Sequence, residues 1–421
     1  MLVQFKVGNY LSFKEPQTLS LVASSDDSLP QNTFPVPGIE GTSLLKSVAI
    51  YGANASGKSN LLKAFQFMRE FVSESAGGQQ GDRIAVTPFK LDPESQGQPS
   101  EFEVMFIHEG ERYVYGFKAD RERVHEEWLS ATRIGARLRS RPLFHRGHGG
   151  NVQWGPTWRG ERRKLEGMVR PNALLLSVAA QFANPIARPV FGWFSGLWAA
   201  SSTELHTSRL VETREGFAGR LSDFMKMADT GIDSWRVDRE PHIEPSRLDV
   251  YRDEERERLL KVFADWPTPK AIHRASDGRD VVFDLLTEES AGTIQLYNLA
   301  GDWLSSLALS WILLKDELEA SLHPLLTRFL LRTAHRSDTT PQLVFTTHEC
   351  SLLDRDLLRR DQIWFTEKRP DGSTELYSLW DFKVKPRQDE DFRGRYLRGR
   401  YGAIPYIGEW SFEQEEEPQT V

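Results

Sequence analysis

The pattern of apolar and polar residues changes its period along the chain, and these changes predict the order of strands and helices. The run Ser47–Tyr51 is short and mainly apolar, which predicts a parallel strand buried on both faces. An amphipathic helix is predicted next by apolar residues spaced three and four apart: Leu61, Phe65, Met68 and Val72. A strand, a glycine-containing turn and a helix therefore form the first clear unit.

Other apolar patterns divide the rest of the chain. Strict alternation predicts two strands within residues 1–23 and an antiparallel meander over residues 101–130. Residues 185–262 have mostly helical spacing. Further elements are predicted as a core strand at 173–178, strands at 281–285, 311–315 and 343–345, helices at 295–309 and 322–330, and a hairpin at 363–379.

These elements predict an α/β fold of two lobes, with a parallel core sheet, an antiparallel β lobe and a helical insertion. The length of 421 residues is sufficient for such an arrangement. We expect the first lobe to comprise residues 1–184, the insertion residues 185–270, and the second lobe with a C-terminal extension residues 271–421.

The turn after the first apolar strand carries the candidate chemistry. Residues 52–59 read Gly-Ala-Asn-Ala-Ser-Gly-Lys-Ser, which fits the phosphate-binding pattern Gly-x-x-x-x-Gly-Lys-Ser/Thr. Its glycines allow backbone N–H groups to point at one phosphate, on the N-terminus of the following helix. Lys58 would reach the β- and γ-phosphates of ATP, and the Ser59 hydroxyl would hold Mg²⁺. We expect the nucleotide to be bound by Gly52, Asn54, Ala55, Ser56, Gly57, Lys58, Ser59 and Asn60.

A second candidate group follows the apolar run at 311–315. Asp316 and Glu317 would be delivered to the carboxyl edge of the sheet, where the phosphates lie. We predict that Asp316 binds Mg²⁺ and that Glu317 polarises the attacking water, because phosphoryl transfer depends on positioning and charge neutralisation. Lys315 departs from this pattern, since a charged residue is unusual in a buried strand.

His348 follows the next predicted strand, and alone it is compatible with an ordinary core histidine. Together with the other motifs we predict that it contacts the γ-phosphate and senses its loss. Cys350, the single cysteine, excludes an intramolecular disulfide and is predicted to be a small buried residue. Cysteine usage and the absence of a signal sequence predict a cytoplasmic protein.

Composition narrows the choice of partners. The net charge of −7 gives the molecule no overall basic field for nucleic acid, and no apolar stretch is long enough for a membrane span. Residues 133–170 are nonetheless rich in arginine, so they are either a nucleic-acid contact face or a solvated hairpin with its loops, and we favour the solvated surface. The arginines are Arg133, Arg137, Arg139, Arg141, Arg146, Arg159, Arg162 and Arg163.

The order of these motifs resembles the ABC-type P-loop NTPase heads of SMC, RecF and OLD proteins. Ser290-Ala291-Gly292 is similar to their signature loop, residues 319–324 to the loop after the catalytic glutamate, and His348 to their switch histidine. Gln181 is similar in placement to their Q-loop glutamine. The resemblance implies two heads that dimerise over ATP, with Ser290 and Gly292 facing the nucleotide of the other subunit. The insertion is too short for the coiled-coil arms of chromosome-organising ATPases.

One branch is more similar still, namely the AAA-type ATP-binding proteins of bacterial phage-defence cassettes. The segments that carry this resemblance are residues 9–13, 52–60, 177–181, 322–325 and 400–405. It implies a homo-oligomer that controls a separately encoded effector nuclease, such as a TOPRIM protein, in response to a phage trigger. Only about 70 residues follow His348, without a convincing acidic metal cluster, so we expect no nuclease activity in this chain. The alternative is a RecF-like repair or recombination ATPase that binds duplex DNA directly; a transporter ATPase is disfavoured.

Overall fold

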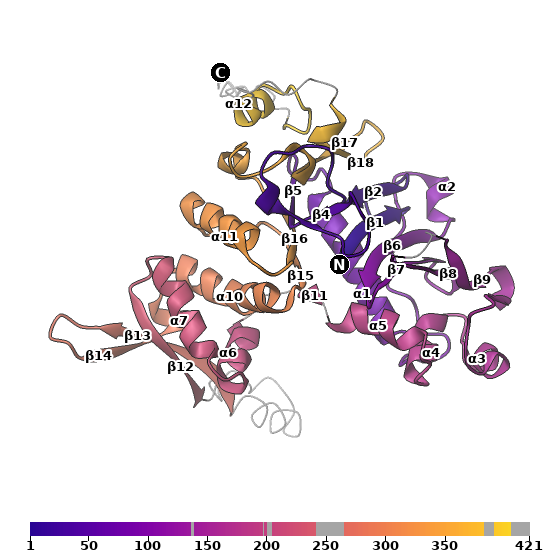
Figure 1. The fold of residues 1–421 in the computed structure, drawn as a ribbon, viewed down its shortest axis with the longest axis horizontal. Helices are drawn as coiled ribbons and strands as arrows, with labels where there is room; N and C mark the ends of the chain where they lie inside the picture. Colours follow the sequence, from indigo (N-terminus) through magenta and orange to yellow (C-terminus); the bar gives the residue numbers. More distant parts are fainter. Residues whose placement is uncertain (136–138, 197, 200–203, 241–264, 383–390, 406–421) are drawn as a thin grey trace, which may run out of the picture.

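The computed structural model describes residues 1–135, 139–196, 198–199, 204–240, 265–382 and 391–405. A six-stranded sheet lies at the centre of the molecule (Figure 1), in the order β11-β15-β16-β5-β17-β18. All its strand pairs are parallel except β17–β18. Its strands are β5 (Ser47–Tyr51), β11 (Trp198–Ala199), β15 (Ile312–Lys315), β16 (Gln342–Thr346), β17 (Ile363–Lys368) and β18 (Thr374–Ser378).

A seven-stranded antiparallel sheet forms the β lobe, in the order β10-β9-β8-β7-β6-β1-β2. The expected meander is confirmed, because β6, β7 and β8 pair in sequence. The strands are β1 (Leu2–Gly8), β2 (Gln17–Ser20), β6 (Ser100–His108), β7 (Glu111–Ala119), β8 (Val124–Arg133), β9 (Arg141–Arg146) and β10 (Val152–Trp154). The helices of this part are α1 (Lys58–Glu74), α2 (Pro93–Gln96), α3 (Arg162–Met168), α4 (Leu175–Gln181) and α5 (Ala187–Gly196).

The second lobe and the insertion lie on the other side of the central sheet, toward the left of Figure 1. A three-stranded sheet, β12-β13-β14, projects from this side with its two helices. The elements are α6 (Glu204–Thr213), α7 (Phe217–Met227), β12 (Ile232–Glu240), β13 (Trp266–Arg274), β14 (Asp280–Asp284), α9 (Leu285–Glu288), α10 (Ala291–Leu309), α11 (Pro324–Arg336) and α12 (Phe392–Leu397). A small pair, β3 (Thr33–Pro35) and β4 (Ser43–Leu45), completes the strands.

The central sheet is covered on both faces, as expected for parallel strands. Alternate residues of β5 enter different cores: Val48 and Ile50 pack with the β lobe and α1, whereas Ala49 and Tyr51 pack with α10 and α11. Each face buries apolar side chains, so the sheet edge with its loops is what remains accessible. The predicted two-lobed α/β architecture, with a parallel core sheet and an antiparallel β lobe, is therefore confirmed.

Two predicted elements are wrong. The apolar run at 173–178 belongs to helix α4 and not to a strand, because a short buried helix has no alternation that distinguishes it from a buried strand. Glu127 stabilises this helix by accepting hydrogen bonds from the backbone N–H groups of Leu175 and Leu176. The helical prediction for 185–262 fails at Ile232–Glu240, which is strand β12. A register shift between Ile232 and Ser234 interrupts the alternation there.

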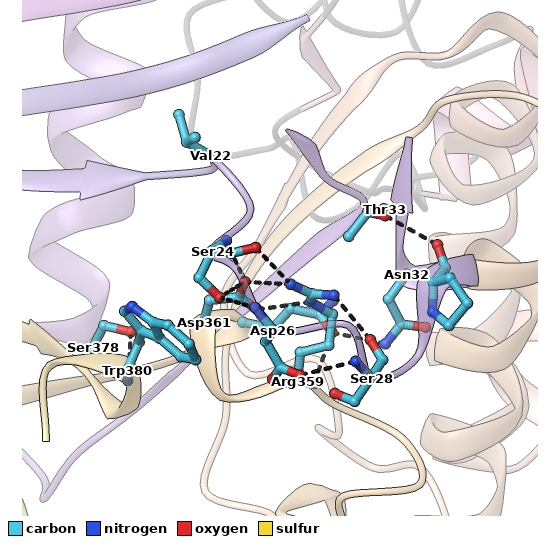
Figure 2. Close-up of polar contacts among 12 residues, drawn as sticks. Val22, Ser24, Asp26, Ser28, Asn32, Thr33, Arg359, Asp361, Ser378 and Trp380 are labelled. Atoms are coloured by element: carbon cyan, nitrogen blue, oxygen red, sulfur yellow. Dashed lines mark hydrogen bonds and ion pairs between the residues drawn. The ribbon is translucent and has the colours of Figure 1, made fainter. Parts of the chain in front are cut away.

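A buried ion pair connects residues 24–32 to the segment that precedes β17 (Figure 2). Arg359 and Asp361 have side chains that are 3% and 6% exposed, with Nη2 and Oδ2 at 2.7 Å. The same carboxylate accepts hydrogen bonds from the backbone N–H and the hydroxyl of Ser24, and Arg359 Nη1 donates to Ser28 O. Asn32 adds a bond to Gln362 Oε1 at 2.7 Å. Residues 24–32 are thereby joined to residues 359–362 beside the central sheet.

Candidate functional site

Strand β5 and helix α1 position the phosphate loop. Every residue of β5 is buried, and the loop begins at Gly52, immediately after the strand ends. Helix α1 begins at Lys58 with Gly57 as its N-cap. The first N–H groups of a helix lack intrahelical partners, so they face the loop and favour an anion there. The loop therefore has the local structure that a phosphate-binding site requires.

The two motif glycines are required by close contacts. A Cβ atom on Gly52 would lie 2.5 Å from Ser56 Oγ and from both oxygens of Thr366. A Cβ atom on Gly57 would overlap the Thr374 hydroxyl, and its φ of +110° is one that side chains with a Cβ rarely adopt. Any larger residue at either position would therefore displace the loop from the neighbouring strands.

Three hydroxyl residues outside the motif hold the loop in place. The Ser56 and Thr366 hydroxyls are 2.7 Å apart, which ties the loop to β17. Thr374 Oγ1 of β18 lies 2.8 Å from both Ser56 O and Ser12 Oγ. Ser12 also accepts a hydrogen bond from Asn60 Nδ2, at 2.9 Å. No local pattern indicates Thr366 or Thr374, because both are far from the loop in the chain. Ser12 lies in one of the segments that carry the family resemblance.

Lys58 lies within the loop itself. Its Nζ donates to Gly52 O at 2.9 Å and to Ala53 O at 3.1 Å. Burial lowers the pKa of Lys58, and the nearby carboxylates of Asp316 and Glu317 oppose that shift. An ammonium group is therefore held beside the carboxylates at the position where the phosphate chain would lie. Asn54 and Ala55, at the tip of the loop, are exposed, whereas Ser59 and Asn60 are half-buried.

The two acidic residues follow β15, as the sequence predicts. Thr346, at the end of the neighbouring strand β16, donates its hydroxyl to Asp316 Oδ1 at 2.5 Å. The same hydroxyl accepts from the backbone N–H of Glu317 at 2.8 Å. Glu317 has a φ of +48°, so the chain turns sharply there. Both carboxylate side chains are exposed at the sheet edge and available to a ligand.

His348 joins this group from the end of β16. It is exposed, and its backbone N–H donates to Glu319 Oε1 at 2.5 Å. Partial desolvation of the ring and the charge of Lys58 lower the pKa of His348, while Glu319 and Glu317 act in the opposite direction. The neutral form of the imidazole is therefore favoured, and this form can donate one hydrogen bond and accept another.

The signature residues lie close to the acidic loop of their own chain. Ser290 caps helix α10, because its hydroxyl accepts from the backbone N–H of Thr293 at 3.1 Å. A Cβ atom on Gly292 would lie 3.0 Å from Ser321 O, so the start of α10 packs on the turn that follows Glu317. The structure thus places Ser290, Gly292 and Ser321 on one continuous surface.

Gln181 is the predicted site residue that the structure does not bring to the loop. It ends helix α4, which is attached to the far end of α1 through the hydrogen bond from Ser177 Oγ to Val72 O. Val72 is fourteen residues beyond Lys58 on the same helix, a separation of roughly 21 Å at 1.5 Å per residue. A role for Gln181 at the nucleotide is therefore not supported in this arrangement, because the residue belongs to a helix and not to a loop after a core strand.

Lys315 is accommodated by a buried carboxylate. It points to the same face of β15 as Leu313, toward α10, where Asp302 is only 3% exposed. Burial lowers the pKa of Lys315, and Asp302 followed by Asp316 opposes the shift. Asp302 also lies 3.2 Å from His206 Nε2 of helix α6. Lys315, Asp302 and His206 thus form a group of charged and polar side chains that extends from the acidic edge of the sheet, through α10, to α6 of the insertion.

A cavity of about 690 Å³ adjoins the phosphate loop on the side of His348. One wall is the loop with His348 and Cys350, and the other is the C-terminal segment. The sequence did not indicate that the C-terminal segment lies here, because its placement depends on contacts with β17 and β5. The residues that line it from this segment are Tyr396, Leu397, Ala403, Ile404 and Pro405.

The fold and loop define a P-loop nucleotide-binding protein. The family described as "AAA domain, putative AbiEii toxin, Type IV TA system" matches residues 47–180 and 204–354, about two thirds of the chain, and the chain therefore belongs to this family. No curated protein matches the chain. Among the described residues, no helix combines the length and apolar content needed to cross a lipid bilayer.

Solved structures with a similar course of the chain include two SMC heads. The SMC head domain from Thermotoga maritima is 12% identical, with a TM-score of 0.41, over 91% of this chain and 99% of that one. The SMC head bound to the C-terminal winged-helix domain of ScpA is 16% identical, with a TM-score of 0.40, over 90% and 97%. Both TM-scores are below 0.5, which is too low to relate individual residues of this site to either structure.

The residues present fit a magnesium–nucleotide complex. The described residues contain no group of three or more His, Cys, Asp or Glu side chains that would hold a metal alone. Mg²⁺ characteristically takes one or two protein ligands and completes its shell with phosphate oxygens and water. Ser59 and Asp316 are the side chains that would hold it, since Ser59 is half-buried at the start of α1 and Asp316 is exposed at the sheet edge.

Proposed function

We propose that this chain is an ATP-hydrolysing switch that assembles as a homo-oligomer and controls a separately encoded effector nuclease in anti-phage defence. The observation that carries the proposal is the meeting of Lys58, Asp316 and His348 at one edge, from β5, β15 and β16. The segments that follow three parallel strands place a cation, a carboxylate and an imidazole at the same edge of the sheet. Such a site suits phosphoryl transfer, which needs positioning and charge neutralisation.

Each residue has a distinct part in the proposed reaction. Lys58 binds the β- and γ-phosphates, and the N–H groups at the start of α1 bind their oxygens. Glu317 orients and polarises the attacking water, and His348 hydrogen-bonds the γ-phosphate and loses that partner after hydrolysis. Mg²⁺, when bound by Ser59 and Asp316, supplies charge neutralisation at the phosphates.

The family supports a role in defence. Its description names a putative AbiEii toxin of a type IV toxin–antitoxin system. We propose that ATP holds two heads together, with Ser290 and Gly292 of each facing the nucleotide of the other, and that a phage trigger or hydrolysis releases the effector. Nucleotide binding and assembly are then thermodynamically linked, so each strengthens the other.

Two substitutions test the switch. Glu317→Gln keeps the side-chain shape but removes the carboxylate, so we expect ATP binding, slow hydrolysis and a persistent dimer by sedimentation. Lys58→Ala removes the cation from the loop, so we expect loss of ATP binding and of the dimer. If Glu317→Gln remains as dissociated with ATP as without it, the switch is wrong. If Lys58→Ala still hydrolyses ATP and still protects cells from phage, the site assignment is wrong.

The effector has its own test. The chain is co-expressed with the open reading frames that flank its gene, and the purified complexes are identified by mass spectrometry. We expect a nuclease-like protein, such as one of the TOPRIM class, to co-purify with wild type. Loss of this protein from the Lys58→Ala complex would show that its retention depends on nucleotide. Absence of any nuclease from the wild-type complex would contradict effector control.

Direct DNA binding in the manner of RecF is the alternative. Several of the arginines in the 133–170 segment are engaged within the protein: Arg141 pairs with Glu111, and Arg146, 4% exposed, lies 3.7 Å from Glu127. Arg162 donates hydrogen bonds to two backbone carbonyl groups of the same segment. Arg137 lies outside the described residues. Duplex affinity that falls steeply with salt, and falls further in Arg139→Glu, would favour this alternative. Weak binding unaffected by that substitution would count against it.

A further inference from the structure

Leu325 is an apolar side chain that the fold holds in solvent next to the acidic loop. It is 68% exposed, although the neighbouring Leu322 and Leu330 are 9% and 0% exposed. His323 caps the helix by accepting from the backbone N–H of Leu325, at 3.2 Å, and Pro324 occupies the first helical position. The exposure of Leu325 is therefore imposed by an ordered helix start and does not come from a loose loop.

Leu325 shares a surface with the predicted signature residues. The turn from Glu317 to His323 is fixed by hydrogen bonds from Ala320 N to Glu317 O and from Leu322 N to Glu319 O. Gly292 packs on Ser321 of that turn. A partner that contacts Ser290 and Gly292 would therefore also meet Leu325, only four residues beyond Ser321.

The cavity beside the phosphate loop has an apolar wall that aromatic contacts hold against the central sheet. Tyr396 of that wall stacks on Phe365 and contacts Tyr51 edge to face, with ring centroids 5.6 and 5.8 Å away, so it packs against β17 and against the strand that precedes the loop. Its hydroxyl donates to Ala403 O at 3.1 Å, which closes the C-terminal turn. Leu397, on the same wall, remains 57% exposed. An apolar group entering the cavity would meet a preformed surface.

We infer that Leu325 of one copy packs against this C-terminal wall of a second copy, beside that copy's phosphate loop. The inference rests on the proposed ATP-dependent dimer, and it adds the C-terminal segment to the interface. The second copy is the fitting occupant, because the turn that carries Leu325 is continuous with the residues expected to face the partner's nucleotide. The chain's own Leu325 does not fill the cavity, since its side chain stays exposed.

The affinity of the dimer tests this contact. In the Glu317→Gln background with ATP, Leu325→Ser and Leu397→Ser should each weaken the dimer by roughly ten- to a hundredfold, as expected for losing a buried leucine. Leu309→Ser is the matched control, because Leu309 is 42% exposed at the opposite end of α10 and lies outside this surface. Nucleotide binding by the isolated variants should remain as in the parent.

Cross-linking tests the geometry directly, because Cys350 is the single cysteine. In a Cys350→Ser background, tagged Leu325→Cys protein is mixed with untagged Leu397→Cys protein and treated with a short bismaleimide. We expect a mixed cross-linked species that forms with ATP and disappears with Lys58→Ala. Leu309→Cys in place of Leu325→Cys should give none.

The outcomes separate this contact from the dimer itself. If the Glu317→Gln protein dimerises with ATP, but Leu325→Ser behaves as Leu309→Ser and no mixed cross-link forms, this contact is wrong while the proposed switch stands. If the Glu317→Gln protein does not dimerise at all, the proposed switch and this contact both fail.

Discussion

Thr346 donates its hydroxyl to Asp316 at a distance of 2.5 Å, across two parallel strands. The same oxygen receives the backbone N–H of Glu317 at 2.8 Å. One buried threonine therefore positions both the carboxylate proposed to hold Mg²⁺ and the backbone of Glu317, which is proposed to polarise the attacking water. Partners of this kind control the orientation of a metal ligand without contacting the metal.

Replacing Thr346 with valine keeps the volume and removes the hydroxyl. We expect ATP binding to persist, and both the magnesium affinity and the turnover to fall by about 10- to 100-fold, because the Asp316 carboxylate loses its anchor. A magnesium titration of the ATPase rate measures this effect. Thr327→Val is the matched control, since the Thr327 hydroxyl is buried without a hydrogen-bond partner in the described structure. Equal rates in the two variants would refute the anchoring role.

Gly57 is required by its backbone angle and by the contact with Thr374. The substitution Gly57→Ala should displace the loop and abolish ATP binding, because the strain at this φ is of order 1–3 kcal/mol before the steric overlap is added. Equilibrium binding of a fluorescent ATP analogue measures the loss. Gly219→Ala, within helix α7 and with no atom near the added methyl group, should bind normally and gain up to about 1 kcal/mol of stability. Normal binding by Gly57→Ala would contradict the steric argument.

The parallel sheet and its chemistry could be predicted because local patterns specify them. Buried parallel strands are continuous apolar runs, and the residues after β5, β15 and β16 meet at one edge by topology alone. The sequence alone therefore predicts that the loop, Asp316, Glu317 and His348 lie at the same edge of the sheet. Lys315 appeared anomalous because its partner Asp302 comes from another element, and tertiary pairs leave no local signature.

The elements that could not be predicted depend on contacts distant in sequence. Helix α4 is an apolar run without periodicity, and it is helical because Glu127 from β8 satisfies its first N–H groups. Gln181 was predicted at the nucleotide from its similarity in placement to a Q-loop glutamine, but it ends this helix and does not follow a core strand. Thr366 and Thr374 support the phosphate loop from more than 300 residues away in the chain, so no spacing rule connects them to it.

The Arg359–Asp361 pair should contribute strongly to stability, because both side chains are buried. Removing one partner of such a pair leaves an uncompensated charge, which typically costs about 3–5 kcal/mol. We therefore expect Arg359→Met to lower the free energy of unfolding by that amount, measured by denaturant titration. Arg369→Met is the matched control, because Arg369 and Glu375 form an exposed pair, worth at most about 1 kcal/mol. Equal losses in the two variants would show that burial of the Arg359 pair is unimportant.

His335 should make stability depend on pH. Burial, with a smaller effect of Lys46, lowers the pKa of His335 from 6.5 to about 3, and its ring lies 2.8 Å from the Ser47 hydroxyl. The folded protein therefore keeps the ring neutral at pH values where the unfolded chain binds a proton. This contribution is fully present above pH 6.5 and is lost as the pH falls from 6.5 toward 3.

The expected slope is up to about 1.4 kcal/mol of unfolding free energy per pH unit within that window. Denaturant titrations at pH 7.5, 6.0 and 5.0 measure it for wild type and for His335→Leu, which cannot be protonated. The variant should start less stable, because it loses the bond to Ser47, but its stability should fall less steeply toward acid. Since other groups titrate in both proteins, only the difference between the two slopes belongs to His335, and parallel slopes would show that the buried ring is not the source.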